Sequence, residues 1–166
     1  MTVSVDVDAS EILALARRFR EAVPTITSLG RRTMQESLDV LRQAIVTRTP
    51  VNTGALRASV MTDVRGQELD DLIGVVSTPL IYGLPVEHGR RPGKMPPVDA
   101  IRYWVIRKQI ADEEGAESAA WMIARAIGRR GTKGAHMFEE GLKASRGAIS
   151  RLWGNTTRLI VRAMGR

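Results

Sequence analysis

The sequence has no cysteine, few aromatic residues and no long apolar run. Without cysteine the chain can form no disulfide, no thiolate metal site and no cysteine nucleophile, which fits a reducing compartment. Aromatic residues make up 4% of the chain, so we expect a core of leucine, isoleucine, valine and alanine. No apolar stretch approaches the ~18 residues of a membrane span, and the segment after Met1 does not resemble a signal peptide. We therefore expect no membrane partner.

The strings that mark common catalytic and metal sites are missing as well. The only histidines are His88 and His136, and neither HExxH nor GxSxG occurs. A zinc site or a hydrolytic triad would need at least one more ligand or nucleophile near them. We interpret both histidines as surface or interface residues, and we expect no catalysis, no metal and no cofactor. A hydrolase built on Glu87 and His88 is the enzymatic alternative.

The length and the net charge of the chain limit its number of domains and its possible partners. Its 166 residues are enough for one domain with its own core. The net charge of +7 permits a nucleic acid or an acidic protein as partner, but it also describes a well-solvated basic protein. Basic residues gather in 90–94, in 125–133 and along the last predicted helix. A nucleic-acid-binding module is therefore an alternative, although no helix-turn-helix, zinc-finger or RNP-like pattern supports it.

Hydrophobic periodicity predicts helices in the first 47 residues. Pro24 is expected to break the first helix near Glu21 or to kink it. From Thr25 to Thr47 the apolar residues recur at helical spacing, and they are Met34, Leu38, Leu41 and Ile45. Such an amphipathic helix needs a sheet or another helix to cover its apolar stripe.

Alternating residues predict a small antiparallel sheet. Pro50 ends the preceding helix, and residues 52–54 have the composition of a turn. The segments that read as strands are 2–7, 55–65, 69–78 and 80–87. The expected fold class is therefore α+β, in which a small antiparallel sheet of three or four strands is packed by a long helix.

The second half of the chain predicts a two-helix insert at 96–130. Residues 90–97, rich in proline and basic residues, read as an exposed loop. Helices are expected at about 98–110 and 116–129, with a break at 112–115. The inward residues of the first are Ile101, Trp104 and Val105, and those of the second are Ala119, Met122, Ile123, Ala126 and Ile127.

A long C-terminal helix is expected at about 135–164. Its inward residues are Phe138, Leu142, Ile149, Leu152, Trp153, Ile160 and Ala163. The preceding segment 128–134 is basic and glycine-rich, but it does not match the phosphate-binding string GxxxxGK followed by Ser or Thr. We interpret it as a connector, or as a mobile loop that touches phosphate or an acidic partner. The domain organisation is then one domain, 1–166, with a core of 1–89 plus 135–164.

Trp121 falls off the apolar stripe of its own predicted helix, unlike Trp104 and Trp153. An exposed tryptophan suggests a subunit interface, and a second buried face is the alternative. The interface candidates are Arg90, Arg91, Lys94, Trp121, Arg129, Arg130 and Lys133.

Two motifs resemble those of a known family. The first runs from Thr49 to Ser59 and the second from Tyr82 to Gly89. They resemble the strings T-P-V/K-D/N-T-G-x-L-R/K-x-S and Y-A/G-x-x-V/L-E-F/Y/H-G of the neck or tail-component family (tail completion, head–tail joining) of long-tailed bacteriophages. The matching residues are Thr49, Pro50, Thr53, Gly54, Leu56, Arg57, Ser59, Tyr82, Val86, Glu87 and Gly89. The resemblance covers about 31–89 and resumes weakly at 137–142.

This resemblance implies an α+β structural protein without catalysis, located in the virion neck or tail and assembled in the host cytoplasm. It implies a ring, as a hexamer or dodecamer, around a channel through which phage DNA passes. The implied neighbours are a head-closure or connector protein and a tail terminator or tail tube protein. The insert 96–130 and the loop 90–94 are then the candidate contacts to neighbouring subunits or rings. We interpret Glu87 as a structural residue that ends a strand and is bonded to Arg57 or to turn amides.

Overall fold

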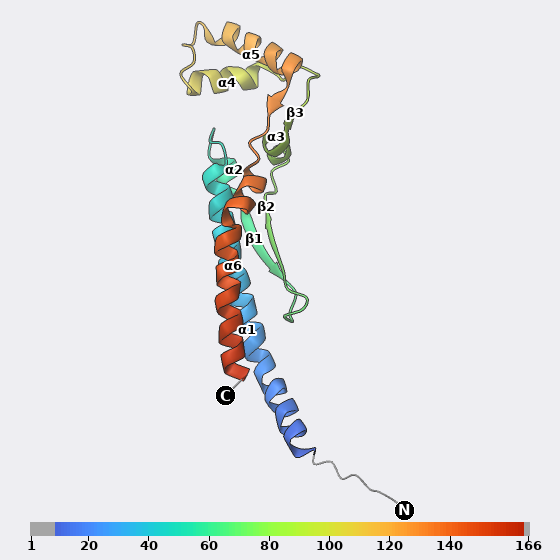
Figure 1. The fold of residues 1–166 in the computed structure, drawn as a ribbon. Helices are drawn as coiled ribbons and strands as arrows, with labels where there is room; N and C mark the ends of the chain where they lie inside the picture. The colour runs from blue at the N-terminus through green and yellow to red at the C-terminus, as the bar shows by residue number, and fades with distance from the viewer. Residues whose placement is uncertain (1–8, 165–166) are drawn as a thin grey trace, which may run out of the picture. The chain divides into compact units, whose positions relative to one another are not determined.

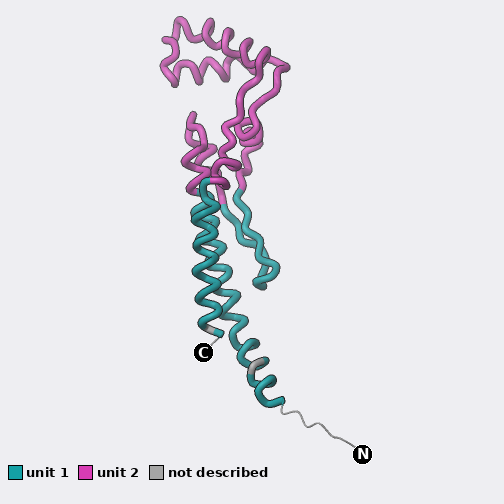
Figure 2. The backbone as a smooth tube through the Cα atoms, viewed as in Figure 1, with its two compact units in different colours: residues 1–42, 62–76, 144–166 teal, residues 43–61, 77–143 magenta. Residues whose placement is uncertain are grey.

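The computed structural model describes residues 9–164, and the expected strand at 2–7 lies outside them (Figure 1). The fold is α+β and mostly helical. The chain divides into two compact units, and each is described by itself (Figure 2). Unit 1 contains residues 1–42, 62–76 and 144–166, and unit 2 contains residues 43–61 and 77–143. No helix in the described part combines the length and apolarity needed to cross a membrane.

The first helix, α1, is longer than expected and runs from Ser10 to Arg48. Pro24 lies inside it, so the break predicted near Glu21 is wrong. A proline removes one helical hydrogen bond and leaves the carbonyl four residues earlier without its donor. Pro24 and Arg20 are both exposed, so water can satisfy the freed carbonyl and the helix continues.

In unit 1, α1 packs against the last helix and against a β-hairpin. The last helix, α6, spans Met137–Met164, and the buried hydroxyls of Thr33 and Thr156 join the two helices at 2.6 Å. The hairpin consists of β1 (Met61–Arg65) and β2 (Ile73–Ser77). A side chain at Gly74 would lie 2.7 Å from the Met34 sulfur. The expected stripe of α1 therefore does cover the sheet, as predicted.

The sheet is smaller than the three or four strands expected. The strands form two separate pairs, β1–β2 and β3–β4, where β3 is Gly89–Arg90 and β4 is Thr132–Lys133. Residues 55–58 form the short helix α2 (Ala55–Ala58), and residues 83–88 form α3 (Gly83–His88).

Both wrong strand assignments have the same physical reason. The buried residues Leu56 and Val60 lie four positions apart, and so do the buried residues Gly83 and Glu87. A separation of four is compatible with one face of a strand and with one face of a helix. The periodicity therefore could not distinguish the two states over such short segments.

Unit 2 contains the insert as a helical hairpin, as expected. It consists of α4 (Val98–Arg107) and α5 (Ala116–Arg130). Its core includes the fully buried Val105, Ala116 and Ala120, with Ile101, Trp104 and Ile123 packed against them.

Three inward assignments are wrong. Met122, Ala126 and Leu142 are exposed, and the side chain of Ala163 is not described. On α5 the alanines 116, 120 and 124 are buried instead, and 116 and 120 share a core with Val105 of α4, where small side chains let the two helices approach closely. The expected loop 128–134 is also shorter, since α5 extends to Arg130 and residues 132–133 form β4.

Candidate functional site

The first motif, residues 49–59, folds into a tight cluster at the end of α1. Thr49 is fully buried, and its N–H and its hydroxyl both donate to the Ile45 carbonyl, at 2.9 and 2.8 Å. The carbonyl of Thr49 accepts a hydrogen bond from Arg57 Nε at 2.8 Å. Thr49 therefore satisfies the Ile45 carbonyl at the end of α1, and Arg57 satisfies the carbonyl of Thr49.

The remaining residues of this motif also have structural roles. Gly54 adopts φ +85°, a left-handed conformation that glycine takes without strain, and α2 starts directly after it. Leu56 is buried. The Ser59 hydroxyl lies 2.7 Å from the Thr78 hydroxyl, which ties this motif to the segment after β2. These contacts give the motif a stabilising role in the fold.

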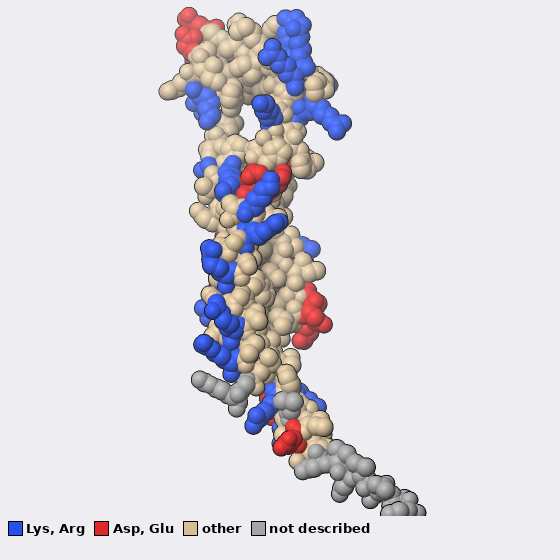
Figure 3. All heavy atoms as spheres, in the orientation of Figure 1, with Lys and Arg blue, Asp and Glu red and all other residues tan. Residues whose placement is uncertain are grey.

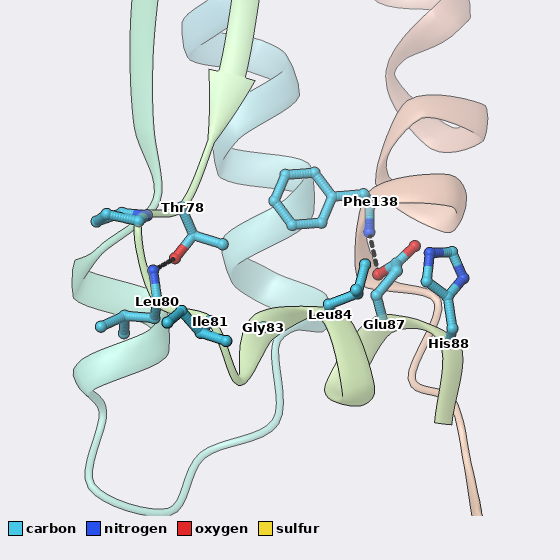
Figure 4. Close-up of a pocket in the computed structure, with 9 residues that line it drawn as sticks. Thr78, Leu80, Ile81, Gly83, Leu84, Glu87, His88 and Phe138 are labelled. Carbon is cyan, nitrogen blue, oxygen red and sulfur yellow. Dashed lines mark hydrogen bonds between the residues drawn. The ribbon is translucent and has the colours of Figure 1, made fainter. Parts of the chain in front are cut away.

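In the second motif, Glu87 is the central residue. The residue is 7% exposed, and its carboxylate accepts a hydrogen bond from the backbone N–H of Phe138 at 2.9 Å (Figure 4). It accepts a second one from the backbone N–H of Glu139 at 3.1 Å. These amides belong to the first turn of α6, where helical N–H groups have no partner within the helix. A negative charge at this position also interacts favourably with the helix dipole. Glu87 therefore caps a helix that begins about fifty residues later.

The prediction for Glu87 is thus only partly right. It is a structural residue bonded to amides, but those amides start a helix, and Arg57 bonds Thr49 instead of Glu87. Backbone bonds support the same junction, because Ala135 N–H donates to the Val86 carbonyl at 2.8 Å and His136 N–H to the Glu87 carbonyl at 3.0 Å.

A cleft of about 610 Å³ lies beside Glu87 and is lined by Thr78, Pro79, Leu80, Ile81, Gly83, Leu84, Glu87, His88 and Phe138 (Figure 4). Its polar groups are mostly engaged. The Glu87 carboxylate is held by two amides, and the Thr78 hydroxyl contacts the Ser59 hydroxyl and the Leu80 N–H. Ile81 is 92% exposed and Leu84 is 68% exposed. The cleft therefore offers mainly an apolar surface for contact with another molecule.

The two histidines do not meet. His88 is exposed in this cleft, whereas His136 precedes α6 and its Nδ1 lies 3.3 Å from Glu139 Oε2. A hydrogen bond from Lys143 lowers the pKa of Glu139, and the same contact raises the pKa of Lys143. Among the described residues no group of three potential ligands could hold a metal ion.

The pairing of β3 with β4 brings the basic interface candidates together. Arg90 pairs with Thr132 and Gly89 with Lys133, and Gly93 N–H donates to the Gly128 carbonyl at 2.8 Å. The loop after β3 therefore lies against the end of α5. We call the resulting cluster the basic root, and it consists of Arg90, Arg91, Lys94, Arg129, Arg130 and Lys133. None of these forms an ion pair with a described residue.

The opposite end of the hairpin is acidic. We call it the acidic tip, and it consists of Asp112, Glu113, Glu114 and Glu117, all exposed. Arg107 and Lys108 lie at the end of α4, but they donate to Asn52 Oδ1 at 3.0 Å and to the Val51 carbonyl at 3.1 Å. Figure 3 shows Lys and Arg gathered over one end of the hairpin, and Asp and Glu together with further Lys and Arg at the other. The hairpin is therefore electrically polarised along its length.

Trp121 is 46% exposed, so of the two alternatives that its off-stripe position left open, exposure holds and the second buried face does not. The guanidinium of Arg125 stacks over its ring, with 5.1 Å between Cζ and the ring centroid. Met122, beside it, is 60% exposed. Tryptophan, methionine and arginine are enriched in protein interfaces and among their energetic hot spots. Sequence reasoning missed Arg125, although its spacing of four from Trp121 could have shown the pair.

Comparison of the chain with protein-family models, with curated proteins and with solved structures found no match.

Proposed function

We propose that the protein is a structural subunit of the neck of a long-tailed bacteriophage. In this proposal copies of the chain assemble into a ring at the head–tail junction and help to join the tail to the head around the DNA channel. The motif resemblance supports the assignment. The contacts of Thr49, Arg57 and Glu87 support a structural role, because Thr49 and Arg57 hold the end of α1 and Glu87 joins α3 to the first turn of α6.

The polarised hairpin carries the proposal of a ring. A contact between two different surfaces on identical subunits is heterologous, and it closes into a ring when the rotation between subunits is right. The acidic tip and the basic root are two such surfaces with opposite charge. Neither is neutralised within the described part of its own chain, so each is available to the complementary surface of the next copy.

The Trp121–Arg125 pair supplies binding affinity that the charged ends alone cannot provide. Exposed charge pairs contribute little affinity, typically about 0–1 kcal/mol each, but they orient the partners and exclude wrong ones. A large aromatic side chain that becomes buried contributes much more. We therefore assign Trp121 as the anchor of the subunit contact and the two charged ends as the groups that set its direction.

A charge swap tests this assignment. The variant E113K/E114K reverses the tip, and R129E/R130E reverses the root. We expect each double variant to lose the ring, because like charges then face each other. The quadruple variant should regain it, because opposite charges meet again with reversed sign. Light scattering after size exclusion, together with negative-stain imaging, measures the assembly state.

The matched control reverses two exposed acidic residues in the β1–β2 loop of unit 1, in the variant E68K/D70K. It changes the net charge as much as the tip variant does, and we expect it to leave the assembly state unchanged. A quadruple variant that stays monomeric, or a control that dissociates like the tip variant, would contradict the head-to-tail contact.

A further inference from the structure

The outer face of α6 has an unusual charge pattern. From Gly141 to Met164 the helix contains no acidic residue and carries Lys143, Arg146, Arg151, Arg158 and Arg162. Polar helix faces of folded proteins usually mix both signs, as α1 does with Arg32 and Glu36. Figure 3 shows basic side chains gathered along the side of the molecule where α6 lies.

Three of these arginines share one face of unit 1. At 100° per residue, Arg151, Arg158 and Arg162 fall within roughly 40° of one another. The buried Ser145 and Thr156 lie on the opposite side of the helix. All three arginines are exposed, and none forms an ion pair with a described residue. Arg158 donates only to neutral oxygens, of Gly154 and Asn155.

Two glycines lie beside this face without a packing reason inside the chain. A side chain at Gly147 would meet only the Arg151 guanidinium, at 3.8 Å, and one at Gly154 would meet nothing within 4 Å. Gly141 on the same helix differs, because a side chain there would lie 2.6 Å from Ile45 Cγ1. A helical glycine costs about 1 kcal/mol relative to alanine. Without side chains at Gly147 and Gly154, a large partner can approach the helix backbone beside the arginines.

We propose that this face of α6, formed by Arg151, Arg158 and Arg162, binds the phosphate backbone of double-stranded DNA. The three arginines extend over about 16 Å of helix at 1.5 Å per residue, so the cations form a line, as the phosphates of a duplex strand do. Guanidinium groups bind phosphate in bidentate geometry. No aromatic side chain lies on this face, so base stacking, by which single strands are held, is absent. The proposal does not depend on ring assembly.

Binding of the full chain to a short fluorescein-labelled DNA duplex, measured by anisotropy from about 50 to about 200 mM salt, tests it. We expect R151Q/R158Q/R162Q to reduce the slope of log K against log salt by about 2.7, because each lost phosphate contact contributes about 0.9. Glutamine keeps the helix propensity close to that of arginine, and circular dichroism checks the fold.

The matched control is R17Q/R18Q/R20Q, which removes the same charge from α1 and should leave the slope as in the unchanged chain. Equal slopes for the α6 variant and the unchanged chain, equal losses in both variants, or no binding of the unchanged chain at about 50 mM salt would overturn the proposal. Displacement of the duplex by polyglutamate at equal charge would point to an acidic protein instead. So would a changed assembly state of the α6 variant with an unchanged slope.

Discussion

Replacing Glu87 by alanine tests the helix cap on which the junction in unit 2 depends. The substitution removes both acceptor oxygens and leaves the N–H groups of Phe138 and Glu139 without their partner. Loss of a helix cap costs about 0.5–2 kcal/mol, and hydrogen bonds to a charged group contribute about 1.5–3 kcal/mol. Because the two bonds share one carboxylate and are not additive, we expect a loss of about 2–4 kcal/mol.

Two further variants separate the cap from a general effect of charge. Glu87→Gln keeps one acceptor oxygen and should lose about half as much stability. Glu140→Ala removes a carboxylate from the same turn of α6, but that side chain is exposed and pairs with Lys143. Water screens an exposed ion pair, so it contributes little to stability, and this control should change little.

Urea unfolding followed by far-ultraviolet circular dichroism measures these changes, with the unchanged chain at the same protein concentration. The order Glu87→Ala, Glu87→Gln, Glu140→Ala in decreasing loss is the expected result. If Glu87→Ala loses no more stability than Glu140→Ala, the carboxylate does not hold α6 and the structural reading of the second motif fails.

Three more predictions follow from single contacts. Trp121→Ala should abolish assembly with no more than about 1 kcal/mol loss of stability, since a half-exposed side chain contributes little within the subunit; an unchanged ring would contradict this. Gly89→Ala should lower the free energy of unfolding, measured in urea, by more than about 1 kcal/mol, because φ is +77° and a β-carbon would collide with β4. Gly93→Ala is the control and should be neutral, because a β-carbon there meets no atom within 4 Å. Lys143→Gln should raise the lowered pKa of Glu139 in a carboxyl NMR titration; an unmoved pKa would refute the pairing.

The lowered pKa of Glu139 determines the pH range in which this carboxylate stabilises the fold. A carboxyl whose pKa is lowered in the folded state stabilises the fold above its ordinary value of 4.5. This contribution disappears as the pH falls through the lowered pKa. The difference in stability between the unchanged chain and Lys143→Gln should therefore be present at neutral pH and vanish in acid.

The long helices and the insert could be predicted from sequence because their periodicity extends over many turns. The stripe of Met34 and Leu38, the core of Val105 and the exposure of Trp121 all follow from helical spacing. The stripe of α5 was only partly right, because Ile123 packs against the core whereas Met122 and Ala126 are exposed, and the buried alanines 116, 120 and 124 were missed. The alanines of that helix are the residues that its close packing requires.

The short elements could not be predicted in the same way. In residues 55–60 and 80–87 the spacing of buried residues fits a helix and a strand equally, and only tertiary contacts such as that of Ser59 with Thr78 decide between them. The basic root was foreseen as separate basic stretches, but the pairing of Arg90 with Thr132 that joins them connects segments forty-two residues apart. No local pattern encodes such a pairing.

The assembly state of the purified chain decides whether the protein is a ring-forming subunit. Light scattering and negative-stain imaging of the unmodified chain, alone and with virion fractions, should show closed rings with a central opening and the same protein at the head–tail junction. A protein that stays a single subunit at all concentrations and is missing from the particles would contradict the account.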